Sequence, residues 1–237
     1  MADSVWTHLS ASPVTWLLAT LMAYRFSLAV YEKAGRSPLA HPVAVSVALL
    51  VTGLGIAQVP YETYFDGARF IHFLLGPATV ALAIPLYAQL KRIRRSWPKL
   101  LAGALLGSAA SVITAVGIAS LLGASHMTVL SMAAKSVTMP IAIGITGEIG
   151  GTASLTSALV MLTGILGATT AQGILKRMGM TDPGTSGFAL GVAAHGIGAS
   201  RAFQLNQEMG AFAGLAMGLA GALTATLLPF CLRLAGF

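Results

Sequence analysis

The sequence predicts an all-α fold, a polytopic membrane helix bundle, from three observations. The 237 residues are 56% hydrophobic and only 9% charged, with a mean hydropathy of +0.80, whereas a soluble domain carries about 25% charged residues. Several apolar runs are long enough to cross a bilayer. Two stretches, Met132–Ser157 and Thr181–Phe203, interrupt the apolar pattern with charge, proline and glycine. We therefore expect about seven or eight membrane segments, two of them broken or re-entrant, in a single integral membrane domain over residues 1–237.

The charge balance points to a membrane rather than to nucleic acid. The net charge of +7 comes largely from short loops, which suits the preference of basic residues for the cytoplasmic side. We expect membrane lipid, and no nucleic acid, among the partners. The single Cys231 provides no disulfide framework. The polar N-terminus lacks the basic region of a cleavable signal, so none is expected.

The first part of the chain contains two apolar runs and an amphipathic connection. The run at 13–31 is long enough to span, and Arg25 within it is expected to face a partner helix or reach the interface. The run at 41–59 follows a short basic loop. Residues 60–69 then form an amphipathic segment, whose tyrosines suit the headgroup level.

The middle of the chain begins with a proline-interrupted run and a basic segment. Pro77 and Pro85 fall inside the apolar run 70–89, which predicts a broken helix. The segment 91–99, KRIRRSWPK, holds five of the fourteen basic residues. We interpret it as a solvated cytoplasmic loop, in preference to a site for lipid or another ligand.

Counting the later spans produces a conflict that a re-entrant segment resolves. Runs at 100–122 and 155–175 are each long enough to cross, and Lys176 and Arg177 mark another basic loop. If every run crossed once, the two basic loops would lie on opposite sides. A re-entrant hairpin, or two short half-helices, at Met132–Ser157 restores them to the same side. An internal repeat is also expected, because LLGPATVALAIP and SVTMPIAIGI each place a proline inside an apolar run.

The stretch Met132–Ser157 is the first candidate site. Lys135 and Glu148 are the only full charges between Leu100 and Leu175. Pro140 would remove a helical hydrogen bond and leave a carbonyl without its partner. Such backbone is tolerated at membrane depth only inside protein or beside a water-filled cavity, and an ionisable residue there indicates function. The alternative is that Lys135 reaches an interface and Pro140 is a packing kink.

The stretch Thr181–Phe203 is the second candidate site. Asp182 followed by Pro183 is typical of a helix start. Four glycines then punctuate the apolar segment, and Ser200 would cap a new helix at Arg201, whose N-terminal amides would attract an anion. His195 is either part of this site or a hydrogen-bonded core histidine.

The sequence contains no motif of a soluble enzyme. It has no phosphate-binding glycine loop with its lysine, no HExxH pair, no paired cysteines and no GxSxG elbow. We therefore expect neither an enzyme nor a catalytic residue, and no metal or other cofactor.

The chain resembles the LrgB/CidB family from about Pro60 onward. The resemblance rests on KSVTMPIA, GEIGGTASLTSALVMLTGILGA, GFALGVAAHGIGASRAF and GAFAGLAMGLAGALTATLLP, with LLGPATVALAIPLY and PYETYFDGARF in addition. One departure is Met139, where many members carry a small hydroxylated residue. This chain therefore offers no side-chain hydroxyl to a substrate at that position.

The resemblance implies two different functions. Bacterial members, acting with a small membrane partner of the LrgA/CidA type, are known as holin- or antiholin-like modulators of murein hydrolase export and autolysis. A similar plastid protein carries glycolate and glycerate, and some bacterial pairs are linked to pyruvate uptake. Broken helices and buried charge are typical of a secondary transporter. We therefore expect a carrier of small 2-hydroxy or 2-oxo monocarboxylates, of the glycolate, glycerate, pyruvate or lactate class. The holin/antiholin-like function is the alternative.

The expected substrate site draws on both unusual stretches. Half-helix N-termini with Lys135 or Arg201 would meet the carboxylate, and hydroxyl side chains would meet the neighbouring hydroxyl or keto oxygen. The expected substrate-binding residues are Lys135, Ser136, Thr138, Pro140, Thr152, Gly198, Ser200 and Arg201.

An anion that enters a negative cytoplasm needs a co-moving cation. We expect proton coupling through His195, whose ordinary pKa lies near working pH, with Glu148 as the alternative carrier. Sodium is the other candidate ion. The resemblance places the chain in the bacterial inner (cytoplasmic) membrane as a multi-pass protein. It also suggests a homo-oligomer and an LrgA/CidA-type partner.

Overall fold

The computed structural model describes residues 11–35, 37, 40–81, 83–234 and 236. The chain divides into two compact units, residues 1–81 and 82–237. The helices of the first unit are α2 (Pro13–Lys33), α3 (Pro42–Ala57), α4 (Tyr61–Phe73) and α5 (Leu75–Ala81). In this unit α2 packs against α3 and α4, and Trp16 lies edge-on to Tyr64.

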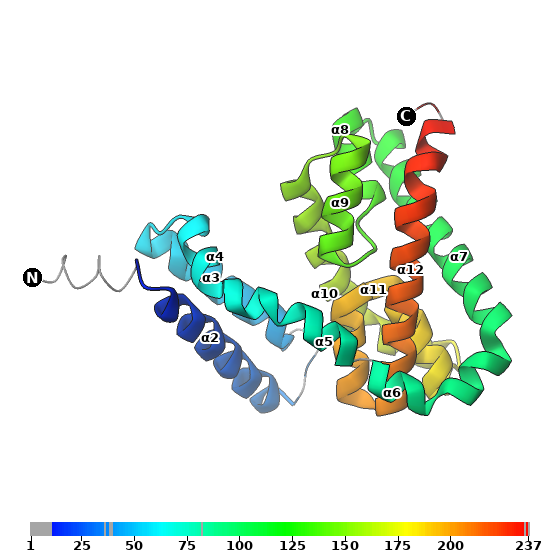
Figure 1. Ribbon diagram of the computed structural model, residues 1–237, viewed down its shortest axis with the longest axis horizontal. Coiled ribbons are helices and arrows are strands. Elements are labelled where there is room, and N and C mark those ends of the chain that lie inside the picture. Colours follow the sequence, from blue (N-terminus) through cyan, green and yellow to red (C-terminus); the bar gives the residue numbers. More distant parts are fainter. Residues whose placement is uncertain (1–10, 36, 38–39, 82, 235, 237) are drawn as a thin grey trace, which may run out of the picture. The chain divides into compact units, whose positions relative to one another are not determined.

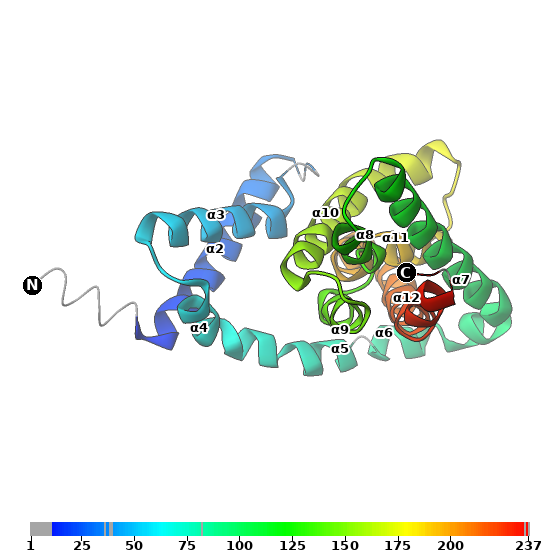
Figure 2. The same ribbon diagram turned by 90° about the horizontal axis from the view of Figure 1, so that it is seen from above.

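The second unit contains the candidate sites. Its helices are α6 (Ala83–Ala88), α7 (Leu90–Leu121), α8 (His126–Ala133), α9 (Met139–Ile149), α10 (Ala153–Arg177), α11 (Pro183–Leu205) and α12 (Gln207–Leu234). Helix α12 is the central element, because α7, α9 and α11 all pack against it, as Figure 1 and Figure 2 show from two directions.

The described part of the chain folds into helices joined by short turns, as predicted, and contains no strand. Five stretches are long and apolar enough to cross a membrane, namely Pro13–Lys33, Tyr61–Ala88, Leu90–Leu121, Ala153–Arg177 and Gln207–Leu234, of which the second includes residue 82, outside the described residues. The apolar helices α3 and α9 are shorter. The chain is therefore a multi-pass α-helical membrane protein.

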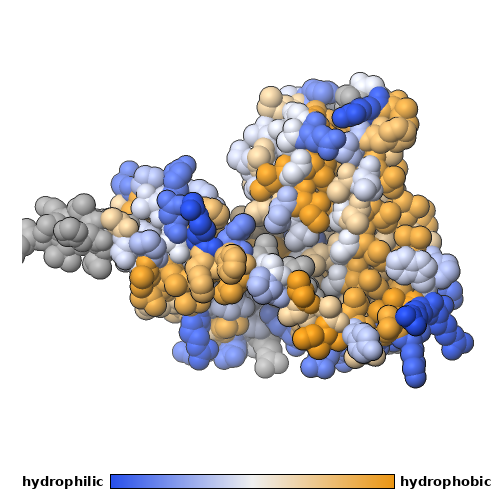
Figure 3. Space-filling view, viewed as in Figure 1, coloured by the Kyte–Doolittle hydropathy of each residue, from blue (hydrophilic) through white to orange (hydrophobic). Residues whose placement is uncertain are grey.

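Large apolar side chains on the outside of the second unit face the bilayer. Ile113, Leu121 and Leu166 are 69%, 88% and 60% exposed, which would be costly in water. On the face in Figure 3, hydrophobic residues cover the middle of this unit and hydrophilic residues gather toward its ends. The distribution is that of a membrane-spanning body.

The basic segment 91–99 is helical, which corrects its interpretation as a loop. It forms the first turns of α7, with Pro98 inside the helix, because lysine and arginine are good helix formers. Arg92 bonds Asp182, five residues beyond Arg177. Both basic segments therefore lie at the same end of the unit, as the parity argument required. We call this the basic end.

Helices α8 and α9 fold back on each other around the turn 134–138. The Ser131 hydroxyl of α8 accepts a hydrogen bond from the amide of Thr152, just beyond the end of α9, at 2.8 Å. The Thr156 hydroxyl donates to the Ser131 carbonyl and pairs with the Thr146 hydroxyl. These buried hydroxyls therefore hold α8, α9 and α10 together.

Helix α11 also changes direction inside the unit. Its backbone leaves the helical region at Ala194 and His195, where φ is −131° and +40°. Beyond this kink, a Cβ on Gly198 would lie 2.6 Å from the carbonyl oxygen of Leu190. Residues eight apart in a straight helix are roughly 12 Å apart along the axis, so the two halves of α11 lie side by side. Both ends of α11 are at the basic end, where Pro183 and Asn206 line one hollow.

The two turns meet inside the unit. A Cβ on Gly196, just past the kink, would lie 3.3 Å from the Thr138 methyl group in the α8–α9 turn. The turns approach from opposite ends, because α8 begins at the end of the unit where Arg233 contacts Glu148 and α11 begins at the basic end (Figure 1).

Each folded-back segment precedes a long helix, α10 in one case and α12 in the other. This repeated order differs from the expected repeat, which paired LLGPATVALAIP with SVTMPIAIGI. That segment crosses the boundary between the two units and includes residue 82, outside the described residues.

Candidate functional site

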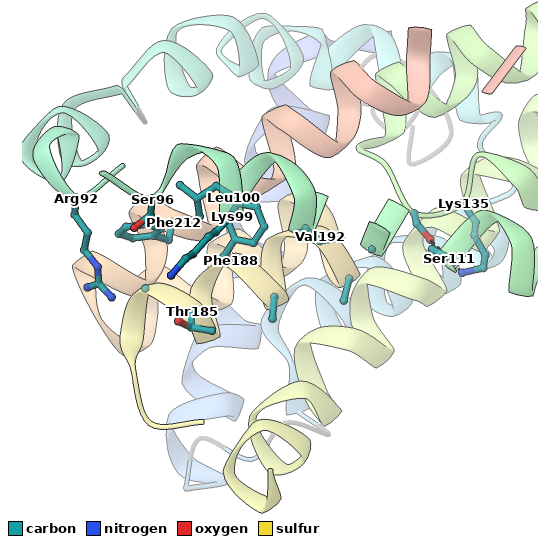
Figure 4. A pocket seen from close by; sticks show the side chains of 16 residues that line it. Arg92, Ser96, Lys99, Leu100, Ser111, Lys135, Thr185, Phe188, Val192 and Phe212 are labelled. Carbon is teal, nitrogen blue, oxygen red and sulfur yellow. Dashed lines mark hydrogen bonds between the residues drawn. The ribbon is translucent and has the colours of Figure 1, made fainter. Parts of the chain in front are cut away.

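A cavity of about 680 Å³ lies within the second unit and reaches the α8–α9 turn. Its wall comes from α7, from the α8–α9 turn, from the first half of α11 and from Phe212 of α12 (Figure 4). The residues that line it are Arg92, Ser96, Lys99, Leu100, Gly103, Gly107, Ser111, Lys135, Ser136, Gly184, Thr185, Phe188, Ala189, Val192, Ala193 and Phe212.

The inner end of the cavity carries a row of three polar groups. The Lys135 ammonium donates to the Ser136 hydroxyl at 3.1 Å, and the hydroxyls of Ser136 and Ser111 are 2.5 Å apart. Because lysine only donates, Ser136 accepts from it and shares a second hydrogen bond with Ser111 of α7. Helix α9 begins four residues after Lys135, so its unpaired amides add positive potential near this turn.

The opposite end of the cavity is formed by cations at the basic end of the unit. Arg92 contacts both Asp182, at 2.7 Å to each carboxylate oxygen, and Glu208. Its guanidinium lies 5.1 Å from the centre of the Phe212 ring. Arg92 therefore joins α7 to the start of α11 and to the start of α12. Lys99, also in the lining, is exposed.

Asp182 binds both Arg92 of α7 and the first turn of α11. It caps α11 by accepting from the amide and the hydroxyl of Thr185 at 2.8 and 2.7 Å. Hydrogen bonding from the Thr185 hydroxyl, then from Arg92, lowers the pKa of Asp182 from 3.8 to about 2. Asp182 is therefore ionised at neutral pH and holds the N-terminus of α11 to α7.

The charged residues in the lining are all basic, namely Arg92, Lys99 and Lys135. Arg92 is balanced by two carboxylates, whereas Lys135 meets a neutral hydroxyl. Lys99 precedes Ser111 by twelve residues of helix, roughly 18 Å at the helical rise. One small anion therefore cannot bridge the cations at the two ends. The arrangement attracts anions at the basic end and offers one cation, with two hydroxyls, at the inner end.

The structure brings together only part of the predicted site. Lys135 and Ser136 line the cavity, and Thr138 occupies the N-cap position of α9, beside the kink of α11, without a side-chain capping hydrogen bond. Pro140 lies in the first turn of α9, where its missing N–H costs no helical bond. It therefore starts a helix, which corrects the expectation that it interrupts one. Thr152 occupies the N-cap position of α10 without a side-chain capping hydrogen bond, and its amide donates to the Ser131 hydroxyl.

The predicted residues of α11 have different roles. Gly198 allows the two halves of the helix to touch, since its Cβ would overlap the Leu190 carbonyl. Ser200 does not cap a new helix at Arg201, because the second half of α11 already begins after His195. That expectation is corrected.

Arg201 is 7% exposed and donates to Gln204 at 3.3 Å and to Gln172 of α10 at 3.5 Å. It is not part of the cavity lining. Of the two cations predicted to meet a carboxylate, Lys135 is therefore the one that lines this cavity.

The two candidate coupling residues have contrasting surroundings. His195 is 3% exposed, and its Nε2 pairs with the carbonyl of Val160 in α10 at 3.0 Å. It lies at the kink, one residue from Ala194 and two from the lining residue Ala193. Glu148 lies at the end of α9 opposite Lys135, about half exposed, and contacts Arg233 at 3.6 Å.

Sequence reasoning missed Ser111 and the rest of the α7 wall. Positions 96, 99, 103, 107 and 111 recur at helical spacing, and all line the cavity. A Cβ on Gly103 would lie 3.3 Å from Phe188, and one on Gly107 would lie 2.8 Å from Val192. The stripe of small and polar residues was a usable signal, but within a Gly-, Ala- and Ser-rich span it suggested only helix packing.

The comparisons with known proteins agree with the resemblance of the sequence. The model of the LrgB-like family matches residues 20–234. An uncharacterized protein of Haemophilus influenzae is 30% identical over 225 residues, 94% of this chain and 97% of that protein. The uncharacterized protein YwbG of Bacillus subtilis is 32% identical over 216 residues, 91% and 96% of the two chains. No solved structure matches. With its apolar spans, the chain is a multi-pass membrane protein that belongs to the LrgB-like family.

Proposed function

We propose that this protein is a secondary transporter of small 2-hydroxy or 2-oxo monocarboxylates, of the glycolate, glycerate, lactate or pyruvate class. The observation that carries the proposal is the cavity with Lys135, Ser136 and Ser111 at its inner end. The Lys135 ammonium can bind one carboxylate through charge-assisted hydrogen bonds. The adjacent serine hydroxyls can hydrogen-bond to an oxygen on the neighbouring carbon of the substrate.

The surrounding backbone supports transport over a simple pore. The α8–α9 turn and the kink of α11 approach each other from opposite ends of the unit. We interpret them as two broken helices that meet at the substrate site, an arrangement used by secondary transporters to place helix ends around an anion. The N-terminus of α9 and the start of the second half of α11 both lie at this meeting point.

The proposal places the protein in the bacterial inner membrane with the basic end in the cytoplasm. The second unit carries Lys91, Arg92, Arg94, Arg95, Lys99, Lys176 and Arg177 at this end, which fits the positive-inside rule. A homo-oligomer and a small LrgA/CidA-type partner remain part of the proposal, on the strength of the family alone.

The test is uptake by the purified protein in liposomes, with radiolabelled glycolate, lactate and pyruvate. Saturable uptake that distinguishes these acids from sugars and amino acids supports a carrier. An unselective leak of all small solutes would instead favour the holin-like alternative.

Lys135→Met tests the site itself. We expect uptake to fall more than tenfold with the protein still folded, since a lost charged hydrogen bond is worth about 1.5–3 kcal/mol. Lys99→Met is the matched control, because it removes a lysine from the basic end of the same cavity. Normal uptake by Lys135→Met would refute the assignment of the carboxylate to Lys135.

A further inference from the structure

We propose that Ser111 of α7 determines specificity by recognising the oxygen on the second carbon of the substrate. The inference rests on the proposed transport function and deepens it. The sequence pointed to hydroxyls in the interrupted stretches, whereas the structure adds one from a continuous helix, 2.5 Å from Ser136.

The position of Ser111 relative to Lys135 supports this role. Both residues line the inner end of the cavity, and Ser136 bridges them. In a 2-hydroxy or 2-oxo acid, the oxygen on the second carbon is adjacent to the carboxylate. A carboxylate at Lys135 would therefore bring that oxygen to the Ser136–Ser111 pair.

The chemistry of a hydroxyl fits both oxidation states of the substrate. A serine hydroxyl donates one hydrogen bond and accepts others. It can therefore donate to a keto oxygen or accept from a substrate hydroxyl, whereas an ammonium can only donate. The hydroxyls of Ser111 and Ser136 are hydrogen-bonded to each other.

The other hydroxyls of the lining lie elsewhere. Ser96 is one turn beyond Arg92, and the Thr185 hydroxyl is bound to Asp182 at the basic end. Around the inner end the lining continues with Gly107, Val192 and Ala193, which offer apolar or backbone surface. Of the described residues, Ser111 is thus the cavity hydroxyl on α7 that lies beside the Lys135 row.

The experiment compares lactate with propionate, which differ only in the hydroxyl on the second carbon. Initial uptake into liposomes is measured for the wild type and for Ser111→Ala, Ser111→Thr and the matched control Ser96→Ala. We expect Ser111→Ala to lower the lactate-to-propionate ratio of kcat/KM about tenfold. Ser111→Thr and Ser96→Ala should keep the wild-type ratio.

The outcomes separate this inference from the function on which it rests. A wild type that carries selected acids, with an unchanged ratio in Ser111→Ala, overturns the role of Ser111 and leaves the carrier intact. A wild type that shows no saturable carboxylate uptake overturns both. If Ser111→Ala does not fold, Ser111→Cys replaces it. Cysteine is a weaker hydrogen-bonding group, so the same fall in ratio supports the proposal and an unchanged ratio refutes it.

Discussion

At the scale of single residues, His195 combines backbone strain with a buried polar side chain. It is one of two non-glycine residues with positive φ among the described residues, and such conformations cost about 1–3 kcal/mol and cluster at functional sites. Its ring bonds to Val160 of α10, and a Cβ on Gly164 would lie 2.8 Å from the ring. A change in the protonation of His195 would therefore alter its contacts with α10 and the kink that joins the two halves of α11.

The first prediction is that proton coupling depends on His195. Uptake driven by an imposed pH gradient should persist without sodium and be lost in His195→Gln, because glutamine can donate to Val160 but cannot carry the proton. Flux in proteoliposomes under separate pH and sodium gradients measures this. His126→Gln, an exposed histidine at the start of α8, should transport normally. Uptake that needs sodium and ignores the pH gradient would contradict the prediction, as would exchange that needs neither.

The sequence identified candidate site residues where a charged side chain lies in an apolar stretch. Lys135 was found because it is a charge in an apolar stretch, and it does line the cavity. Arg201 gave the same signal, yet it bonds Gln172 and Gln204, because a pattern along one chain does not show which helix a side chain faces. Ser111 gave no signal, since a serine among glycines and alanines is an ordinary packing residue.

At the scale of helices, close backbone contact between α11 and α12 shapes the second unit. Cβ atoms on Gly187 and Gly191 would lie 2.0 and 2.2 Å from the carbonyl oxygens of Met209 and Ala213. Contacts of this kind are impossible for a side chain. The first half of α11, one wall of the cavity, is therefore positioned by glycine.

The second prediction follows from these distances. Gly191→Ala should destabilise the protein by at least about 1–3 kcal/mol, because the methyl group would overlap backbone that cannot move aside. Gly218→Ala on α12 is the control, since nothing lies within 4 Å of its Cβ position. Thermal unfolding in detergent compares the two variants. Equal melting temperatures would show that α11 and α12 are not packed this closely.

The third prediction concerns the charge at the start of α11. Asp182→Asn keeps a good helix cap but removes the ionic contact with Arg92. We expect a loss of about 1 kcal/mol or less, because both side chains are about two-fifths exposed. Asp182→Ala should cost about 1 kcal/mol more through the lost cap.

The pH dependence of that loss has a definite sign. The pKa of Asp182 is lower in the folded protein, about 2 against an ordinary 3.8. Its contribution is therefore fully present above pH 3.8 and disappears as the pH falls toward 2. Melting curves of wild type and Asp182→Asn should differ between pH 5 and 8 by a constant amount and converge below that range. A difference that grows on acidification would refute this account.

Helix boundaries were the least predictable feature at this scale. Pro140 was expected inside a helix, but a proline in an apolar run looks the same in the first turn as in the interior, and here it is in the first turn of α9. The KRIRRSWPK segment was assigned to a loop from its charge, although it forms the first turns of α7. The direction change in α11 was expected near Ser200 and occurs at Ala194 and His195. At these two residues, glycines of α10 leave room for the kink.

At the scale of the whole molecule, charge and exposed apolar surface set the orientation in the membrane. The parity argument from two basic segments required a segment that does not cross, and the Arg92–Asp182 contact does place these segments together. The sequence could predict that the two basic segments lie at the same end, because the side on which each segment lies depends only on the order of spans and charges along the chain. It could not supply the contact between the two turns, which depends on packing of residues far apart in the chain.

The final prediction tests this topology directly. Helix α11 is long enough to cross, yet its two halves lie side by side. Met180 and Asn206, which flank it, should therefore face the same compartment, whereas a straight helix would place them on opposite sides. In a Cys231→Ser background, cysteines introduced by Met180→Cys and Asn206→Cys should react with a membrane-impermeant maleimide only in inside-out vesicles, since we propose that the basic end faces the cytoplasm.

Leu122→Cys provides the opposite reference for the same experiment. Leu122 is 80% exposed and follows the far end of α7, so its cysteine should be labelled in right-side-out vesicles. Labelling of Met180→Cys and Asn206→Cys from opposite sides would mean that α11 crosses the membrane. The cavity would then lose the turn that brings Gly196 to Thr138, and the substrate site built around Lys135 would have to be abandoned with it.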